Sequence, residues 1–365
     1  MSSRRQFLTR LIIGAVGTVG LSTLLLPRDN KPSIVQSLRN QLDQIPPPSA
    51  PNTIGGMPLR IATLSDLNGP YGTTGYRQEV HRAIELIVQG QPDLVLCGGD
   101  MVAGQKKGLS RQQLDAMWAS FDQVIAAPLR QAKIPFLFTF GNHDASNSRD
   151  RQGIFRFESD RQAAADYWNN HLANHNSPNL VWENTSHYPF FWTAKFGNVF
   201  LISWDASGFK LQEEHQQWTW EALRSPEAQQ ASHRIVMGHL PLFVVSKGRN
   251  TAGAILAHPQ KLLSELHHHN VDLYISGHHH AFFLGRSQNM DLLHLGNAGD
   301  GSRAWLNWGR TPEQTLTWMT LPSTPGAIAY DTISLKTGKG IALDTLPGQI
   351  TGFDWRTVRR HGEAT

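Results

Sequence analysis

Residues 135–144 read Pro-Phe-Leu-Phe-Thr-Phe-Gly-Asn-His-Asp, an apolar run that stops at a glycine followed by three polar side chains. A short apolar run beside turn residues is typical of a buried strand. We therefore predict a strand over 135–140 that delivers Asn142, His143 and Asp144 to the loop at its carboxyl end. Open α/β sheets place their active sites at such strand ends.

Four other apolar runs end in the same way, at polar residues that can bind metal ions. Those residues are Asp66 and Asn68 after 59–64, Asp100 after 94–97, His239 after 234–237, and His278 and His280 after 272–276. Apolar residues at helical spacing over 79–89 and 110–127 separate the first three runs. This alternation of strand and helix predicts an α/β fold with crossover connections.

Two further regions have a different pattern. Residues 145–192 are rich in Asn, Arg, His and aromatic side chains, and we expect them to form a long insert or a lid. Residues 327–346 alternate between apolar and polar, which predicts a hairpin that turns at 336–340.

The polar residues at these strand ends suit a pair of metal ions. Carboxylate, amide and imidazole groups bind Mn, Fe or Zn, and two ions together can activate water for attack on a phosphate ester. Asp100 follows two glycines, so its backbone can turn sharply enough for the carboxylate to bridge two ions. On an extended loop, His278 and His280 would point to one side and His279 to the other. His143, oriented by Asp144, would suit proton transfer.

In this order, the motifs resemble those of the calcineurin-like metallophosphoesterase superfamily, which includes purple acid phosphatases and cyclic-nucleotide phosphodiesterases. The resemblance covers about residues 58–300. It implies a four-layer α/β/β/α sandwich of two mixed sheets, with the site at the strand ends. It also implies these roles: Asp66 and His280 bind the first metal, Asp100 bridges, Asn142, His239 and His278 bind the second metal, and His143 is the catalytic histidine.

Two positions depart from the family pattern. Asn68 stands where the family usually has His, and Ala103 stands where purple acid phosphatases have a metal-binding Tyr. Three interpretations of Asn68 stay open: it binds through its oxygen, it holds a metal-bound water, or it leaves the first metal weakly held. The sequence therefore predicts a metal-dependent phosphoesterase acting on phosphomonoesters or phosphodiesters. The alternative is a non-catalytic ligand-binding protein with an impaired first metal site.

The loop that follows Asn68 should line the cleft, because it leaves the first metal motif directly. Within it, Tyr71 and Arg77 are candidates for contact with a phosphate or a base of the substrate. The alternative interpretation is a turn that carries surface aromatics.

The N-terminus predicts export. Arg4 and Arg5 precede an apolar stretch over 11–26 and resemble a twin-arginine signal. We expect residues 1–30 to be this signal or a membrane anchor that faces the periplasm, and the Pro-containing residues 31–57 to be a linker. The metallophosphoesterase domain is expected over 58–348 and a tail over 349–365.

Composition limits the remaining classes of function. The net charge of +4 is dispersed, which argues against a nucleic-acid partner and agrees with a small phosphorylated substrate. The single cysteine, Cys97, lies in the apolar run 94–97 and excludes an intrachain disulfide. We predict that it is a buried strand residue rather than a nucleophile.

Overall fold

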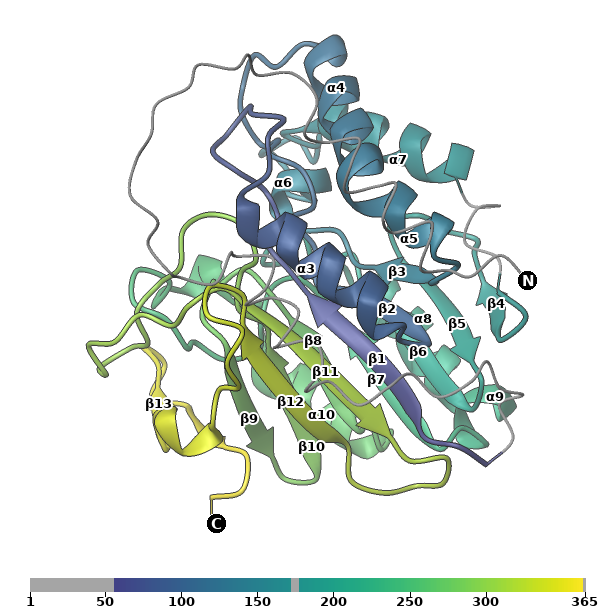
Figure 1. Ribbon diagram of the computed structural model, residues 1–365, viewed down its shortest axis with the longest axis vertical. Coiled ribbons are helices and arrows are strands. Elements are labelled where there is room, and N and C mark those ends of the chain that lie inside the picture. Colours follow the sequence, from purple (N-terminus) through teal and green to yellow (C-terminus); the bar gives the residue numbers. More distant parts are fainter. Residues whose placement is uncertain (1–55, 172–176, 364–365) are drawn as a thin grey trace, which may run out of the picture. The chain divides into compact units, whose positions relative to one another are not determined.

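The computed structural model describes residues 56–171 and 177–363 (Figure 1). The predicted signal or anchor and all but the last two residues of the predicted linker lie outside the described residues. Within the described ranges, no helix is both long and apolar enough to cross a membrane.

The first sheet contains the strands that carry the first three motifs. Its order is β12-β11-β1-β2-β3, with β1 parallel to β2, β2 parallel to β3, and β11 antiparallel to both β1 and β12. The bounds of its strands are β1 Leu59–Leu64, β2 Leu94–Cys97, β3 Phe136–Phe138, β11 Thr315–Leu321 and β12 Ala329–Ser334. The parallel register sets the carboxyl ends of β1, β2 and β3 side by side, as their motifs require.

The second sheet has nine strands in the order β13-β14-β9-β10-β8-β7-β6-β5-β4. Its bounds are β4 Leu180–Asn184, β5 Trp192–Phe196, β6 Val199–Ser203, β7 His233–Met237, β8 Leu273–Ser276, β9 Phe283–Ser287, β10 Met290–His294, β13 Gln349–Thr351 and β14 Thr357–Arg360. The strands β6, β7, β8 and β10 form a parallel centre, and the outer pairs are antiparallel. Both sheets are therefore mixed, which confirms the predicted fold class.

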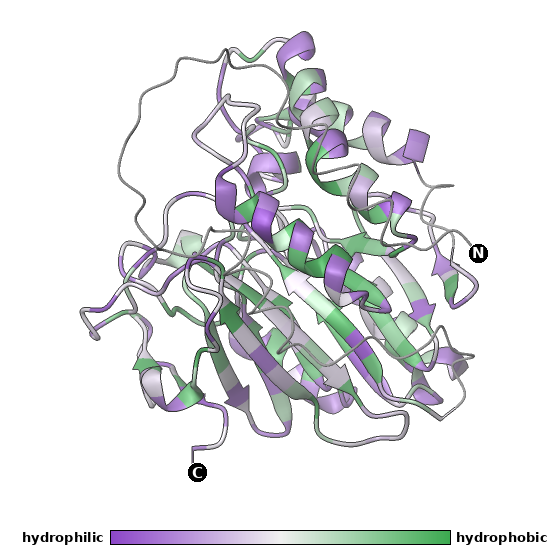
Figure 2. Ribbon diagram, in the orientation of Figure 1, coloured by the Kyte–Doolittle hydropathy of each residue, from purple (hydrophilic) through white to green (hydrophobic). Residues whose placement is uncertain are grey.

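The two sheets share one apolar core. Ile61 and Leu96 of the first sheet belong to the same buried cluster as Leu201 and Ile275 of the second. Apolar colouring follows the strands of both sheets (Figure 2). The helices are α3 Gln78–Gly90, α4 Arg111–Phe121, α5 Ala127–Gln131, α6 Asn142–Ala145, α7 Glu158–His171, α8 Glu213–Arg224, α9 Pro226–Gln229 and α10 Pro259–His268, with 3-10 turns Ala252–Ala254 and Leu343–Thr345.

Helix α3 follows the predicted pattern, since Val80, Ala83, Ile84 and Ile87 are buried along one face. Cys97 is fully buried on β2, and burial raises the pKa of its thiol, so the prediction of an inert strand residue agrees with its environment.

The predicted helix over 110–127 is interrupted. It starts as expected, with Ser110 as N-cap in a capping box, but a π-helical turn at Asp122–Ala126 separates α4 from α5. Pro128 explains the turn, because proline lacks an N–H and its ring collides with the carbonyl four residues earlier in a regular helix. Arg130 crosses the widened turn and pairs with Asp122 at 2.8 Å.

Three sequence-based boundaries differ from the structure. The predicted hairpin over 327–346 is present only as a short one. On one side β12 pairs with β11, and on the other side the chain that returns after the turn forms the bridge Ile333–Gly340, with the amide of Ile341 donating to the carbonyl of Thr332 at 2.7 Å. Residues 349–360, predicted to be part of a tail, supply β13 and β14, and β14 pairs with β9. The region 145–192 contains α7, whose Trp168 stacks on Phe138 of β3 at a ring separation of 3.7 Å, so this helix is part of the core.

Candidate metal centre

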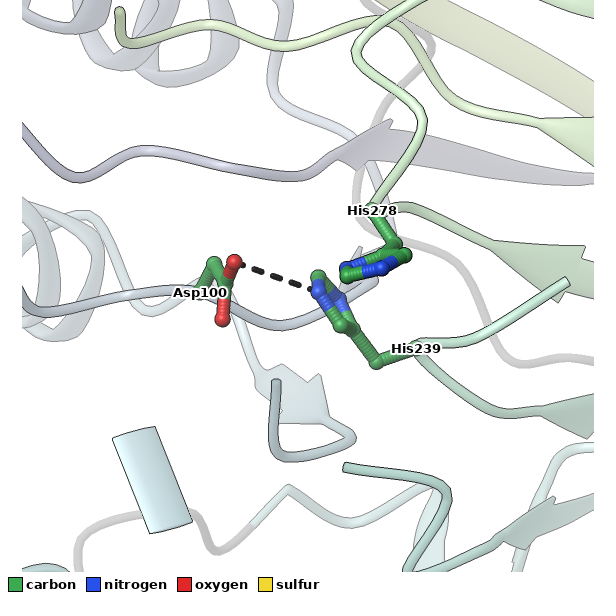
Figure 3. Close-up of side chains that lie close together, drawn as sticks. All are labelled: Asp100, His239 and His278. Atoms are coloured by element: carbon green, nitrogen blue, oxygen red, sulfur yellow. Dashed lines mark ion pairs between the residues drawn. The ribbon is translucent and has the colours of Figure 1, made fainter. Parts of the chain in front are cut away.

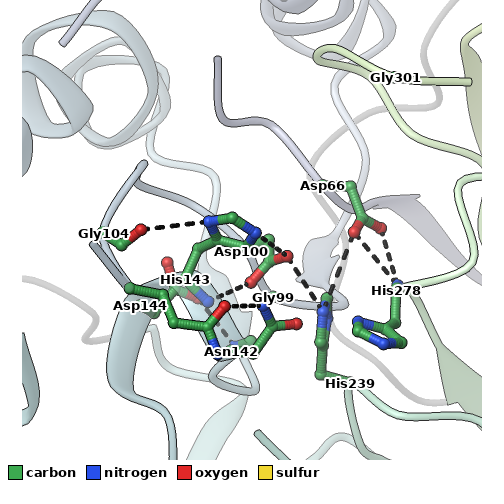
Figure 4. A network of polar contacts seen from close by, with 12 residues as sticks. Asp66, Gly99, Asp100, Gly104, Asn142, His143, Asp144, His239, His278 and Gly301 are labelled. Atoms are coloured by element: carbon green, nitrogen blue, oxygen red, sulfur yellow. Dashed lines mark hydrogen bonds and ion pairs between the residues drawn. The ribbon is translucent and has the colours of Figure 1, made fainter. Parts of the chain in front are cut away.

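The five motif loops are joined to one another by hydrogen bonds (Figure 4). The amide of Asp66 donates to the carbonyl of Gly99 at 2.9 Å, which ties the loop after β1 to the loop after β2. The amide of His143 donates to Asp100 Oδ1 at 2.8 Å, and the amide of His278 donates to Asp66 Oδ1 at 3.1 Å. The first two bonds join loops of the first sheet, and the bond from His278 to Asp66 joins the second sheet to the first, so both sheets contribute to the site.

Four of the predicted ligands have left-handed backbone conformations. The φ angles are 53° for Asp66, 55° for Asp100, 65° for His278 and 50° for His280. Such conformations cost roughly 1–3 kcal/mol each for residues other than glycine, and they cluster at functional sites. The short polar side chains of Asp and His are among those that tolerate this region best.

We expected the loop 277–280 to be extended, but these backbone angles show that it is not. The side chain of His279 nevertheless points away from the other two histidines. Its Nδ1 accepts from the amide of Val245 at 3.1 Å, and its Nε2 lies 2.9 Å from the carbonyl of Ala254. His279 thus anchors the loop, while His278 and His280 face the carboxylates.

One group of ligand atoms consists of Asp100, His239 and His278, whose atoms lie within 4.8 Å of one another (Figure 3). Three buried atoms have no hydrogen-bond partner here: His239 Nε2, His278 Nδ1 and Asn142 Oδ1. The opposite atom of two of these side chains is held, because His239 Nδ1 lies 2.8 Å from the carbonyl of Gly98 and Asn142 Nδ2 donates to Gln105 at 2.6 Å. His239 Nε2 faces Asp100 Oδ2 at 3.2 Å, and side chains fixed in this way present their remaining nitrogen or oxygen atom to the centre of the group, as metal ligands do.

A second group consists of Asp66, Asp100 and His280, also within 4.8 Å of one another. His280 Nδ1 lies 3.1 Å from the carbonyl of Gly301, which leaves Nε2 facing Asp66 Oδ1 at 3.1 Å. Asp100 belongs to both groups, as expected of a bridging carboxylate. Asn68 is buried beside this group, and its backbone N–H donates to the backbone carbonyl of Asp100 at 3.2 Å.

The electrostatics of the cluster suit cations. Burial acts to raise the pKa of both Asp66 and Asp100, but the neighbouring imidazoles outweigh burial and hold both carboxyls below their usual range. Burial acts to lower the pKa of His239, but Asp100 and Asp66 raise it to about 9. Two fully buried carboxylates require compensating positive charge. The donor set and the unpaired lone pairs therefore fit two metal ions.

His143 lies beside the ligands rather than among them. Its Nε2 is 3.9 Å from Asp100 Oδ2, and its Nδ1 is 3.3 Å from the carbonyl of Gly104. Burial lowers the pKa of this imidazole, although Asp100 acts in the opposite direction.

From the sequence we expected Asp144 to orient His143, but the structure shows no bond between the two side chains. Asp144 Oδ1 accepts from the amides of Met101 and Val102 at 2.7 and 2.9 Å, and its Oδ2 accepts from the amide of Gly141 at 2.8 Å. These bonds join the loops after β2 and β3. Burial and the nearby Asp100 raise the pKa of Asp144 to about 7. Asp144 is therefore a positioning residue, and the carbonyl of Gly104 takes the place that we had assigned to it.

The two predicted substrate residues differ. The ring of Tyr71 lies 4.6 Å from the ring of His143 and is half exposed, so it forms a wall beside the centre. Arg77 pairs with Asp300 at 2.5 Å and with Glu79 at 3.3 Å. The charge of Arg77 is already compensated by these carboxylates, so it differs from an arginine that is free to bind a phosphate. The pair with Asp300 joins the 69–77 loop to the segment 297–300. Gln105, which holds the side chain of Asn142, was not among the predicted site residues, because nothing in its local sequence marks it as a partner of Asn142.

A cavity of about 620 Å³ lies elsewhere in the described residues. Its lining includes Asn147, Arg161, Phe191, Asp205 and His215, and none of the predicted metal ligands. The chemistry of the cluster, rather than this cavity, identifies the candidate site.

Gly99 supports the close approach of the loops. Its φ is +96°, and an added Cβ would lie 2.6 Å from the amide nitrogen of Gly141 and 2.9 Å from His239 Nδ1. We expect Gly99→Ala to destabilise the fold by roughly 1–3 kcal/mol or more and to displace His239, with loss of bound metal. Urea unfolding and metal content measure these effects.

Gly108 provides the matched control for that variant. Its φ is +84°, but an added Cβ would meet nothing within 4 Å. Gly108→Ala should show only the backbone cost and should retain metal. Equal effects of the two substitutions would contradict a role for close packing at Gly99.

Comparison with known proteins agrees with this geometry. The model of a protein family described as calcineurin-like phosphoesterase matches residues 59–282. No curated protein matches the sequence. A purple acid phosphatase from yellow lupin seeds (Lupinus luteus) is similar in structure, with a TM-score of 0.58 and 15% identity, over 80% of this chain and 54% of that chain. This chain thus spans about half the length of the lupin protein, and the likeness shows the fold alone.

Two other solved structures are less similar. GAP50, described as the anchor in the inner membrane complex of Plasmodium, has a TM-score of 0.48 and 16% identity over 78% of this chain and 87% of that one. A dimetal phosphatase from Danio rerio has a TM-score of 0.46 and 12% identity over 76% of this chain and 99% of that one.

Proposed function

From the premise that this chain belongs to the calcineurin-like phosphoesterase family and is a metal-dependent phosphoesterase, we propose that its centre holds two metal ions and hydrolyses small phosphate esters. The observation that carries the proposal is the set of three buried ligand atoms that face Asp100, of which Asn142 Oδ1 and His278 Nδ1 have no hydrogen-bond partner and His239 Nε2 has only the Asp100 carboxylate, at 3.2 Å. In this assignment one ion would be held by His239, His278 and Asn142, the other would be held by Asp66 and His280, and both would share Asp100.

The metal pair would neutralise charge on the phosphoryl oxygens and lower the pKa of water. The chain's own residues supply the proton chemistry. His143 stands outside both ligand groups, and the carbonyl of Gly104 fixes its Nδ1, so that Nε2 is the atom available to a leaving-group oxygen. Burial lowers the pKa of His143, which makes its protonated form a stronger acid toward that oxygen. Tyr71 shields one face of the imidazole.

An assay of the full chain with p-nitrophenyl phosphate and bis(p-nitrophenyl) phosphate tests this proposal. The protein is supplied in turn with Fe, Mn or Zn, the ions that suit oxygen and imidazole donors. We expect hydrolysis that stops on chelation and returns with one of the ions. Absence of hydrolysis with every ion and both esters would favour the alternative of a non-catalytic ligand-binding protein.

Asn68 separates these two functions. If Asn68 serves a working first site, Asn68→His should lower kcat/KM by about 10–100-fold, the usual effect of disturbing a metal's surroundings. The bulkier imidazole would also have to enter a position that is 6% exposed. Steady-state kinetics with metal analysis measures the change. A gain of activity would instead mean that the native first site is impaired.

We also propose that the protein is exported through a twin-arginine-like signal and acts in the periplasm, free or anchored. The support is the sequence around Arg4 and Arg5, followed by the apolar stretch 11–26. Replacing both arginines by lysine should leave the protein in the cytoplasm, as measured by cell fractionation. Unchanged export of the variant would overturn this part of the proposal.

A further inference from the structure

Two arginines lie on neighbouring loops beside the metal centre. Ser246 and Trp305 form an isolated antiparallel bridge, and the amide of Lys247 donates to the carbonyl of Ala304 at 2.8 Å. These contacts hold the loop of Arg249 against the loop of Arg303. An added Cβ at Gly248 would lie 3.4 Å from Arg303 Nη1, so the guanidinium of Arg303 reaches over the Arg249 loop.

Both loops are attached to the loop 277–280 that carries two proposed ligands. Before the Arg249 loop, the amide of Val245 donates to His279 Nδ1 at 3.1 Å. The amide of Arg303 donates to the carbonyl of His280 at 3.0 Å. Burial lowers the pKa of Arg303, the charge of Arg249 lowers it further, and Asp66 and Tyr71 act in the opposite direction. Arg303 therefore lies close to His280 and Asp66 of the first ligand group and to Tyr71.

Neither guanidinium has a carboxylate partner among the described residues. The Nε atoms of Arg249 and Arg303 are buried and make no hydrogen bond. Other arginines of the chain differ, since Arg130 pairs with Asp122 at 2.8 Å and Arg161 pairs with Asp205 at 2.9 Å. Two adjacent, half-buried cations without counter-charge repel each other, and an anion between them would remove this cost.

We propose that Arg249 and Arg303 form an anion-binding site next to the metal centre, which makes this phosphoesterase selective for phosphomonoesters over phosphodiesters. The inference rests on the proposed function and names its substrate class. A phosphomonoester carries about −1.5 to −2 charge at neutral pH and three acceptor oxygens. A diester carries one negative charge, and its second substituent takes an oxygen from the arginines. A planar guanidinium group binds two phosphate oxygens through two parallel N–H···O bonds. Loss of either arginine would therefore remove charge-assisted hydrogen bonds.

The test measures the binding of inorganic phosphate to the metal-loaded full chain by calorimetry. The variants are Arg249→Gln and Arg303→Gln, and the control is Arg310→Gln, an exposed arginine seven residues beyond Arg303. We expect each test variant to weaken phosphate binding by roughly 10–100-fold, as is typical of a lost charged hydrogen bond, and the control to bind normally. Metal content should stay unchanged in all of them.

Kinetics with the two p-nitrophenyl esters gives the second measurement. In the test variants, kcat/KM for the monoester should fall by the same factor as phosphate affinity, and kcat/KM for the diester should fall by much less. Arg303→Lys, which keeps the charge but loses the planar fork, should lie between wild type and Arg303→Gln. Unchanged phosphate binding, or an equal fall for both esters, would overturn the proposal. If the wild type hydrolyses neither ester but phosphate binding falls as expected, the anion site stands and the proposed function fails.

Discussion

Asp100→Asn is expected to abolish hydrolysis and to empty both metal positions. Asp100 is the residue shared by the two ligand groups, and its side chain is almost fully buried. The amide removes the negative charge that the imidazoles and two cations would share, while the shape of the side chain is kept. We expect kcat/KM to fall on the order of 10³-fold or more, which corresponds to about 4 kcal/mol of lost transition-state stabilisation.

The fold should survive this substitution. The amide of His143 donates to Asp100 Oδ1 at 2.8 Å, and an asparagine oxygen can accept the same bond. Asp115→Asn is the matched control, because it makes the same chemical change at an exposed carboxylate on α4 that pairs with Arg111. Metal analysis and kinetics of both variants decide the matter. An Asp100→Asn variant with two metals per chain and most of its activity would remove Asp100 from the bridging position.

His143→Ala is expected to lower kcat by about 10²–10⁴-fold while metal content stays normal, which is the usual range for loss of a general acid or base. The metals should remain because His143 belongs to neither ligand group. The loss should be larger for an alkyl phosphate than for p-nitrophenyl phosphate, because p-nitrophenolate leaves without needing a proton.

His268→Ala, at an exposed position near the end of α10, is the control for loss of an imidazole. Kinetics with the two leaving groups, together with metal content, distinguishes proton transfer from a structural role. An equal loss for both substrates would argue against proton transfer. Loss of metal from the His143→Ala variant would make His143 a ligand.

Local sequence patterns were sufficient to predict the strands that carry the site. Each of β1, β2, β3, β7 and β8 is a short apolar run that ends in a polar motif, and the structure brings the motif loops together. Parallel pairing of β1 with β2 and of β7 with β8 explains why separate runs meet at one edge. The two mixed sheets followed from the family resemblance rather than from periodicity.

Errors arose where the partner of a residue lies far away in sequence. Asp144 follows His143 directly, yet its carboxylate bonds the amides of Met101 and Val102 about forty residues earlier. Arg77 was expected to contact the substrate, but its side chain pairs with Asp300, which lies more than two hundred residues away in the sequence. Pairing of this kind depends on how the sheets pack, and the local sequence contains no signal for it.

The order of strands at the sheet edges was also outside the reach of local patterns. The residues 349–360 were expected to be part of a tail. They form the strands β13 and β14 because β14 pairs with the edge of β9. Similarly, β12 forms its long ladder with β11, whereas the chain that follows it adds only a short pairing around the bridge Ile333–Gly340. Edge strands are completed by whichever segment reaches the free backbone groups, so tertiary contacts decide their pairing.

The most direct test of the binuclear centre is elemental analysis of the purified full chain after supply of Fe, Mn or Zn. The buried ligand atoms of Asn142, His239 and His278 and the shared carboxylate of Asp100 predict about two metal atoms per chain for at least one of these ions. One atom per chain, or none, with every ion supplied would contradict the account.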